Sequence, residues 1–166
     1  MEVYFIRHTT PDVPRGTSYG HSDVPLKASF PEELDTVRAK LETIPGFDRY
    51  YSSPLSRCTR LAEGLGQTPP IVDRRLIEIN FGDWEMRFWD GDTLAVLKRV
   101  IATPAPNGES YRQVQERVVS FLNDLGRYPL PPSRDSRTDQ CAHLSSRLVV
   151  QVLTMRSTGT PASSSR

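Results

Sequence analysis

Residues 3–6 form a short apolar run of β-branched and aromatic side chains, and this run ends abruptly at Arg7 and His8. About four to six such residues, bounded by polar and turn-forming ones, are typical of a buried strand. Ligands of a parallel α/β sheet bind beyond the carboxyl ends of its strands, so Arg7 and His8 are expected at a binding site. The rest of the chain has to be compatible with a histidine at the end of its first strand.

Strand and helix patterns alternate after this run. Apolar side chains at helical spacing predict helices over residues 29–44, 54–66, 90–102 and 109–125, and short apolar segments predict strands over residues 47–53 and 71–72. Ser29 is the expected N-cap of the first helix, and Glu32 would complete a capping box with it. The alternation favours an α/β fold with a parallel core sheet flanked by helices.

The length of the chain is that of one domain, and its net charge indicates no preference for a strongly charged partner. The chain has 166 residues, enough to bury a core, and its formal net charge of +1 gives no case for nucleic acid or an anionic membrane as partner. No apolar stretch approaches the length of a membrane span, and Glu2 stands where a signal peptide would be basic. Cys58 and Cys141 are too few for a disulfide framework, so we expect a cytoplasmic protein.

The two parts of the chain differ in amino-acid composition. Residues 1–126 carry 15 basic and 18 acidic side chains, whereas residues 127–166 carry six Arg, two Asp and neither Lys nor Glu. The second part is rich in Ser, Pro and Arg, and residues 148–153 form its only run able to bury much apolar surface. We therefore predict a folded domain over residues 1–126 and an atypical tail over residues 127–166.

A second arginine is expected beside the histidine of the first strand. The predicted second strand ends near residue 53, and Arg57 follows in the first turn of a helix, whose N-terminal N–H groups favour anions. Each residue alone has a plain structural explanation, as a partly buried histidine or a solvated arginine. Together, Arg7, His8 and Arg57 at adjacent strand ends would form a compact site for a dianion, because an arginine can grip two phosphate oxygens at once.

Three motifs carry a family resemblance. Residues 6–9 (Ile-Arg-His-Thr), 52–57 (Ser-Ser-Pro-Leu-Ser-Arg) and 76–85 (containing Leu-Ile-Glu and Phe-Gly-Asp-Trp-Glu) occur in the order and at the separations typical of the histidine phosphatase, or phosphoglycerate mutase-like, superfamily. Within it, residues 19–26 (Tyr-Gly-His-Ser-Asp-Val-Pro-Leu) make the chain most similar to bacterial alpha-ribazole phosphatases. The resemblance covers residues 2–125 and implies a phosphoglycerate mutase-like parallel-sheet core flanked by helices.

The resemblance implies a role for each site residue. His8 would be the nucleophile that forms a phosphohistidine, and Arg7 and Arg57 would bind the phosphoryl oxygens. Glu78 would protonate the leaving alcohol, which requires a raised pKa and therefore partial burial. Neither a metal nor another cofactor is implied, and three scattered His with two distant Cys have no metal-site spacing.

The implied function is metal-independent hydrolysis of a small phosphorylated metabolite. Alpha-ribazole 5′-phosphate of the cobalamin pathway is one substrate that the resemblance implies. A broad sugar-phosphate phosphatase or mutase is a second hypothesis, and a phosphate-binding remnant without turnover is a third. The sequence leaves the oligomeric state open.

The sequence departs from the family after residue 126. The family has a fourth motif, a strand ending in Thr/Ser-His-Gly whose histidine contacts the phosphoryl group. This motif is missing from the sequence, and His143 has no strand pattern before it. Reading the possible codons of residues 135–138 one base later permits Thr-His-Gly. We therefore predict that a frameshift near Tyr128 replaced the end of the fold, and that the structure of the tail is poorly specified.

Overall fold

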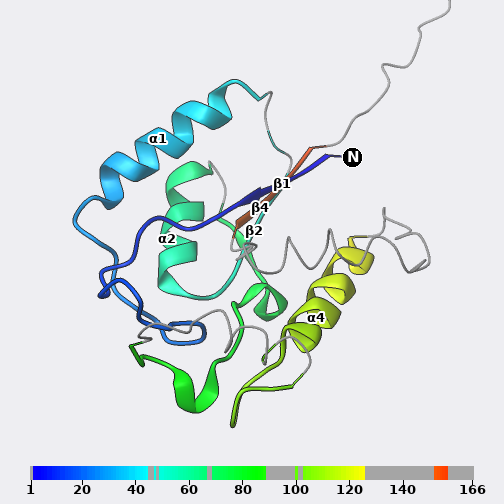
Figure 1. Ribbon diagram of the computed structural model, residues 1–166. Helices are drawn as coiled ribbons and strands as arrows, with labels where there is room; N and C mark the ends of the chain where they lie inside the picture. The colour runs from blue at the N-terminus through cyan, green and yellow to red at the C-terminus, as the bar shows by residue number, and fades with distance from the viewer. Residues whose placement is uncertain are drawn as a thin grey trace, which may run out of the picture.

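The computed structural model describes residues 2–44, 47, 49–66, 69–88, 100 and 103–125, together with the backbone of residues 152–156. The strands are β1 (Glu2–Ile6), β2 (Arg49–Ser52), β3 (Ile71–Val72) and β4 (Val152–Arg156). The helices are α1 (Phe30–Glu42), α2 (Ser56–Leu65) and α4 (Tyr111–Asp124), with two short 3₁₀ helices, η1 (Arg74–Leu76) and η2 (Gly82–Trp84), between β3 and α4 (Figure 1). The helix predicted over residues 90–102 lies outside the described residues apart from Val100, and so does most of the predicted tail.

The four strands form one sheet in the order β1-β4-β2-β3. β4 runs antiparallel to both of its neighbours, with Val152 opposite Ile6 of β1 and Ser52 of β2, and β2 pairs with β3 in parallel. β1, β2 and β3 therefore run in one direction, as expected for the core, and their carboxyl ends lie at the same edge. The central β4 runs the other way. Val152 and Leu153 of the apolar run at residues 148–153 lie in β4, and the local pattern could not predict the direction of the strand, because either direction satisfies the backbone hydrogen bonds.

Helices cover both faces of this sheet. Figure 1 shows α1 and α2 on one side of the strands and α4 on the other. On the first side, Ile6 of β1 packs with Leu61 and Ala62 of α2. On the second side, Tyr51 of β2 packs with Phe121 of α4. The α/β architecture predicted from the sequence is confirmed.

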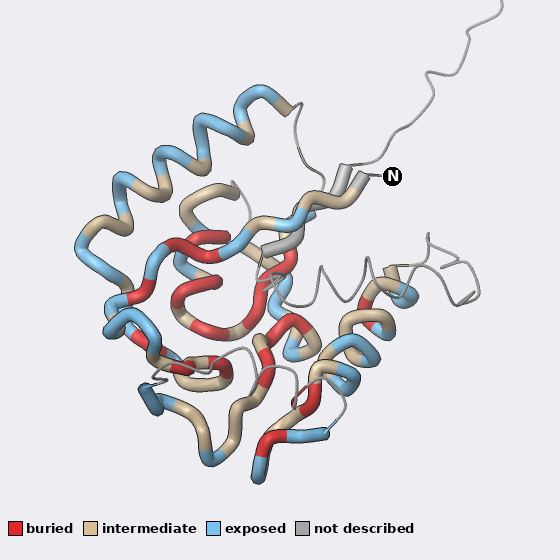
Figure 2. Tube along the Cα trace, viewed as in Figure 1, coloured by how far each residue is buried: buried red, intermediate tan, exposed pale blue. Residues whose placement is uncertain are grey.

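Burial is strongest on one face of α2 (Figure 2). Cys58, Leu61 and Ala62 are fully buried, and they lie on the face that the sequence predicts to be apolar. α1 has no buried residue and packs on α2 through the partly buried Phe30 and Leu34. No helix in the described part of the chain is long and apolar enough to cross a membrane.

The start of α1 differs from the prediction. Ser29 has helical backbone angles, and its hydroxyl donates to Glu33 Oε1 at 2.7 Å instead of accepting from the backbone. The capping box predicted with Glu32 is therefore wrong, because a serine in the helical conformation does not direct its oxygen at the N–H groups of the first turn. A capping box occurs instead at the start of α4, where the side chains of Ser110 and Gln113 accept from each other's backbone N–H groups.

Candidate active site

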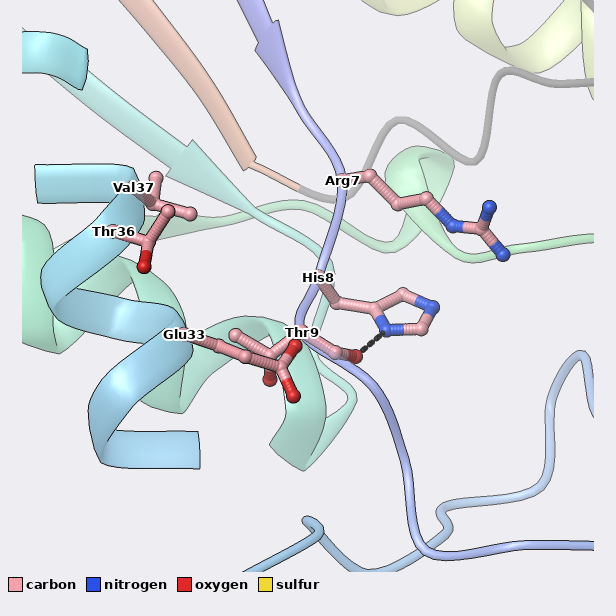
Figure 3. A pocket seen from close by; sticks show the side chains of 6 residues that line it. All are labelled: Arg7, His8, Thr9, Glu33, Thr36 and Val37. Carbon is pink, nitrogen blue, oxygen red and sulfur yellow. Dashed lines mark hydrogen bonds between the residues drawn. The ribbon is translucent and has the colours of Figure 1, made fainter. Parts of the chain in front are cut away.

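A pocket of about 190 Å³ opens where β1 ends, and two of the predicted site residues line it (Figure 3). Its walls come from the residues after β1 and from α1: Arg7, His8, Thr9, Glu33, Thr36 and Val37. In Figure 3 the side chains of Arg7 and His8 extend to the same side of the chain, away from α1. Arg7 and His8 thus share the side of the chain that faces away from α1, whereas the α1 residues of the pocket lie on the other side.

The backbone holds the imidazole of His8 in one tautomer. Its Nδ1 lies 2.5 Å from the carbonyl oxygen of Thr9, so Nδ1–H donates and Nε2 keeps its lone pair (Figure 3). Nε2 is buried and has no hydrogen-bond partner among the described residues. Burial lowers the pKa of His8 to about 4, and the charges of Arg57 and Arg7 act in the same direction. A neutral imidazole with an unprotonated Nε2 can act as a nucleophile at pH 7.

Arg57, in the first turn of α2, is fully buried. Its two terminal nitrogens donate to the carbonyl oxygens of Ser22 and Gly20, each at 2.8 Å. The second of them also donates to Glu78 Oε2 at 3.2 Å. Of the two N–H groups that remain, Nε–H is buried and has no partner in the part of the chain that the structure describes. A buried cation with an open N–H is suited to bind an anion such as a phosphoryl oxygen.

Glu78 stands beside Arg57 with a perturbed pKa. Burial raises the pKa of its carboxyl to about 7, although the charges of Arg57 and Arg7 lower it. At neutral pH such a carboxyl is present in both its acid and its carboxylate form, so it can give a proton to one group and later take one from another. All four predicted site residues therefore lie in one electrostatically coupled cluster.

A pair of residues that sequence reasoning missed fixes the backbone around Glu78. Arg117 of α4 donates to the carbonyl oxygens of Ile77 at 2.5 Å and Glu78 at 3.0 Å, and it pairs with Glu109 at 3.1 Å. Glu109 in turn accepts from the Asn80 N–H at 2.9 Å. Local patterns could not reveal these contacts, because the carbonyl groups lie 39 and 40 residues before Arg117.

A second carboxylate shapes the loop that covers Arg57. Glu85 accepts hydrogen bonds from the backbone N–H groups of residues 20–22 at 2.9 to 3.1 Å. Gly20 passes so close to this region that a Cβ there would lie 1.7 Å from the Ile79 carbonyl oxygen. Glu85 therefore has a structural role, since it holds in place the carbonyl groups that Arg57 contacts.

The N-terminus of α2 offers an anion less than its sequence position predicts. The side chain of Asp23 accepts hydrogen bonds from the backbone N–H and the hydroxyl of Ser56, at 2.8 and 2.7 Å. The Ser56 N–H was expected to bind the anionic ligand, but it donates to the Asp23 carboxylate instead. Arg57 is therefore the group by which α2 contributes to the cluster.

The sequence predicts no separate role for Tyr19, the first residue of the motif at residues 19–26. Its ring nevertheless lies within the site. The centroid of the ring is 6.2 Å from that of His8, and the guanidinium carbon of Arg57 lies 5.2 Å over its face. The charges of Glu78 and of the exposed Arg7 side chain also act on its phenol. Tyr19 therefore belongs to the same cluster as the two arginines.

A second histidine beside His8 is absent from the described part of the chain. His21 is the other histidine there, and its Nε2 lies 3.7 Å from Glu109 Oε2, outside the lining of the pocket. β4 begins at the site edge of the sheet, with Val152 opposite the last residues of β1 and β2. Within the described ranges, no strand between β1 and β2 ends at that edge. His143 lies outside the described residues.

The positive charges near His8 come from the arginine side chains of the cluster. Among the residues that the structure describes, no group of three or more His, Cys, Asp or Glu side chains is arranged to hold a metal ion. The positive charges that act on His8 are those of Arg7 and Arg57. Guanidinium groups bind phosphate oxygens through N–H donors of fixed geometry.

The chain is similar to known proteins over most of its length. The family profile described as Histidine phosphatase superfamily (branch 1) matches residues 3–163. The adenosylcobalamin/alpha-ribazole phosphatase of Salmonella typhimurium is 27% identical over 139 residues, which cover 77% of this chain and 68% of the relative. The profile match extends past residue 126, and the domain boundary expected there stays a prediction.

Solved structures share the fold. The alpha-ribazole phosphatase from Shigella flexneri matches 68% of this chain and 60% of its own, with a TM-score of 0.56 and 28% identity. A phosphoglycerate mutase from Thermus thermophilus matches 65% of this chain and 62% of its own, with a TM-score of 0.53 and 32% identity. The chain thus spans less than two thirds of the length of these two proteins. The phosphoglycerate mutase-like fold expected from the resemblance is confirmed.

Proposed function

The chain belongs to branch 1 of the histidine phosphatase superfamily, and on this premise we propose that it hydrolyses small phosphomonoesters through a phosphohistidine on His8. The observation that carries the proposal is the state of His8. Its Nδ1 proton is committed to the Thr9 carbonyl, and its lowered pKa keeps the ring neutral at pH 7. A neutral imidazole can attack phosphorus without a separate base.

In the first half-reaction, Nε2 of His8 attacks the phosphorus atom in line with the leaving oxygen. The N–P bond forms as the P–O bond breaks, and the acid form of Glu78 donates its proton to the departing alkoxide. Arg7 and the open N–H of Arg57 offset the charge on the phosphoryl oxygens. The products of this step are a free alcohol and a phosphohistidine.

In the second half-reaction, the carboxylate form of Glu78 takes a proton from a water molecule while that water attacks phosphorus. The N–P bond breaks, inorganic phosphate leaves, and neutral His8 and protonated Glu78 are regenerated. A pKa of about 7 suits both halves, because Glu78 changes its protonation state twice in each turnover.

The relatives supply the first candidate substrate. The Salmonella typhimurium relative is an adenosylcobalamin/alpha-ribazole phosphatase, so we place alpha-ribazole 5′-phosphate first. A phosphatase or mutase acting on sugar phosphates is the second enzyme candidate, and the similarity to a phosphoglycerate mutase supports it. Both candidates require the same phosphoryl site and differ in the alcohol that is bound.

A phosphate-binding protein without turnover is the candidate from another class. The direction of β4 supports it, because a strand begins rather than ends beside β1 at the site edge. The family's second histidine, expected at the end of a central strand, therefore has no counterpart among the described residues. Arg7 and Arg57 would still bind phosphate in such a protein.

A phosphomonoesterase assay separates these classes. The substrates are alpha-ribazole 5′-phosphate, a phosphoglycerate and p-nitrophenyl phosphate, and His8→Ala is the control. We expect the wild type to release inorganic phosphate, fastest from alpha-ribazole 5′-phosphate, and the control to release none. Phosphate binding without release would favour the remnant, and neither binding nor release would contradict both proposals.

A further inference from the structure

The ring of Tyr19 lies among the four residues assigned to phosphoryl chemistry. Its face packs against the Arg57 guanidinium at 5.2 Å, and its centroid is 6.2 Å from that of the His8 ring, at an interplanar angle of 65°. The charges of Glu78 and Arg7 act on its hydroxyl. One side chain thus contacts Arg57, borders the nucleophile and is close enough to Arg7 to feel its charge.

The backbone on both sides of Tyr19 is fixed. Before it, Ser18 is buried and exchanges backbone hydrogen bonds with residues 86 and 87, at 2.7 and 2.9 Å. After it, the Gly20 N–H donates to the Glu85 carboxylate at 3.0 Å. A ring anchored in this way can orient its neighbours rather than adapt to them.

We propose that Tyr19 is a positioning residue of the phosphoryl site, which holds Arg7 and Arg57 in the orientations that bind a tetrahedral dianion. The inference rests on the proposed function and adds to it the residue that orders the two cations. In this proposal the ring of Tyr19 orients Arg57 and its hydroxyl orients Arg7, so the two effects can be removed one at a time.

The ring acts on Arg57 through the guanidinium plane. The terminal nitrogens of Arg57 donate to the carbonyl oxygens of residues 20 and 22 and, at 3.2 Å, to Glu78 Oε2. An aromatic face against the cation favours the tilt that these bonds define, through the cation–π attraction. The direction of the open Nε–H follows from that tilt.

The hydroxyl acts on Arg7 by limiting its motion. The Arg7 side chain is exposed, and a long exposed side chain loses conformational freedom when it grips a ligand. In the proposed arrangement the Tyr19 hydroxyl accepts a hydrogen bond from Arg7 and orders that side chain before the phosphoryl group arrives. The phenol has to stay uncharged to do so beside a dianion. Burial raises the pKa of Tyr19 above its ordinary value of 10.0, in keeping with that requirement.

Two substitutions separate the hydroxyl from the ring. Tyr19→Phe keeps the face against Arg57 and removes the proposed acceptor of Arg7, whereas Tyr19→Leu removes the ring as well. Titration calorimetry of the full-length protein with inorganic phosphate measures binding without requiring turnover. We expect the Kd of phosphate to rise about 5-fold in Tyr19→Phe, because binding then has to order a free arginine, and at least about 30-fold in Tyr19→Leu.

Tyr50→Phe is the matched control, because the ring of Tyr50 in β2 packs on Phe47 and burial alone raises the pKa of its phenol. Thermal unfolding checks that each variant is folded, and Tyr19→Phe tests the inference even if Tyr19→Leu does not fold. With p-nitrophenyl phosphate, Tyr19→Phe should raise KM and leave kcat within about 3-fold. The inference is overturned if Tyr19→Phe binds phosphate as tightly as Tyr50→Phe does. The proposed function fails separately, if the wild type neither binds phosphate nor releases it from any phosphomonoester.

Discussion

The guanidinium of Arg57 donates a hydrogen bond to Glu78 Oε2 at 3.2 Å, and the two side chains are 0% and 14% exposed. The cation favours the carboxylate form of Glu78, whereas burial favours the acid form. Burial is the larger effect, so the pKa lies at about 7 instead of below its ordinary value. A phosphoryl dianion on Arg57 would offset the cation, and we therefore expect substrate binding to increase the protonated fraction of Glu78.

Glu78→Gln removes the proton donor and keeps a side chain of similar size. We expect kcat for an alkyl phosphate to fall by about 10²- to 10⁴-fold, and kcat for p-nitrophenyl phosphate to fall by less than about tenfold, because nitrophenolate leaves without a proton. Steady-state kinetics on the two substrates checks this. Equal losses on both would show that Glu78 positions other groups instead of donating a proton.

The same variant has a signature in the pH profile of kcat/KM. Hydrolysis of an alkyl phosphate needs protonated Glu78, so the rate should fall above about pH 7, and it needs neutral His8, so the rate should fall below about pH 4. Glu78→Gln should lose the upper limb and keep the lower one. An upper limb that persists in Glu78→Gln would belong to another group.

Arg57→Lys keeps the charge and loses the planar set of donors. A lysine cannot bond the two loop carbonyls, Glu78 and a phosphoryl oxygen together, so we expect a loss of about 2–4 kcal/mol in transition-state stabilisation. The loss should appear in kcat as well as in KM. Arg60→Lys, at an exposed position of α2, is the matched control and should have no effect. An effect on KM alone would mean that Arg57 only attracts the substrate.

Arg117→Met removes the side-chain donor to the carbonyl groups of Ile77 and Glu78 and the ion-pair partner of Glu109. We expect the free energy of unfolding to fall by about 1–3 kcal/mol, as measured by urea denaturation. Hydrolysis of an alkyl phosphate should fall more than that of p-nitrophenyl phosphate, because Glu78 loses its fixed backbone. Arg112→Met, on the exposed face of α4, should change neither quantity. Unchanged stability and an unchanged ratio of the two rates in Arg117→Met would show that Glu78 is held by other contacts.

Local patterns in the sequence predicted those parts of the fold that depend on neighbouring residues. The apolar run before Arg7 became β1, and the helical spacing after residue 29 became α1, because strand and helix periodicity are local properties. The contacts that complete the site are long-range. Glu85 holds a loop that lies 63 to 65 residues earlier, and no local rule pairs a carboxylate with such a segment.

The direction of the central strand could not be predicted for a related reason. The run at residues 148–153 is able to bury apolar surface, but only Val152 and Leu153 of it lie in β4, whose neighbours in the sheet are far away in the sequence. Arg7, His8, Arg57 and Glu78 could be named in advance because each lies in a motif of the family. Tyr19 lies in such a motif too, but its contact with Arg57 depends on the folded loop.

The frameshift hypothesis is testable with the gene. Shifting the reading frame by one base near codon 128 should restore a strand that ends in Thr-His-Gly. We expect the restored protein to turn over phosphomonoesters at least about tenfold faster than the 166-residue chain, and to resist proteolysis after residue 127, where the present chain should be cut. Turnover by the 166-residue chain that equals the restored protein's, with a protease-resistant tail, would contradict the hypothesis.

Trapping the covalent intermediate tests most directly whether His8 is the phosphate-accepting nucleophile. The full-length protein is mixed with a radiolabelled phosphomonoester, quenched during turnover, and digested to locate the label. The wild type and Tyr50→Phe should both carry an acid-labile, base-stable phosphate on the peptide that contains His8, and His8→Ala should carry none. Label in His8→Ala equal to that in the wild type, or phosphate release by His8→Ala at the wild-type rate, would contradict the assignment.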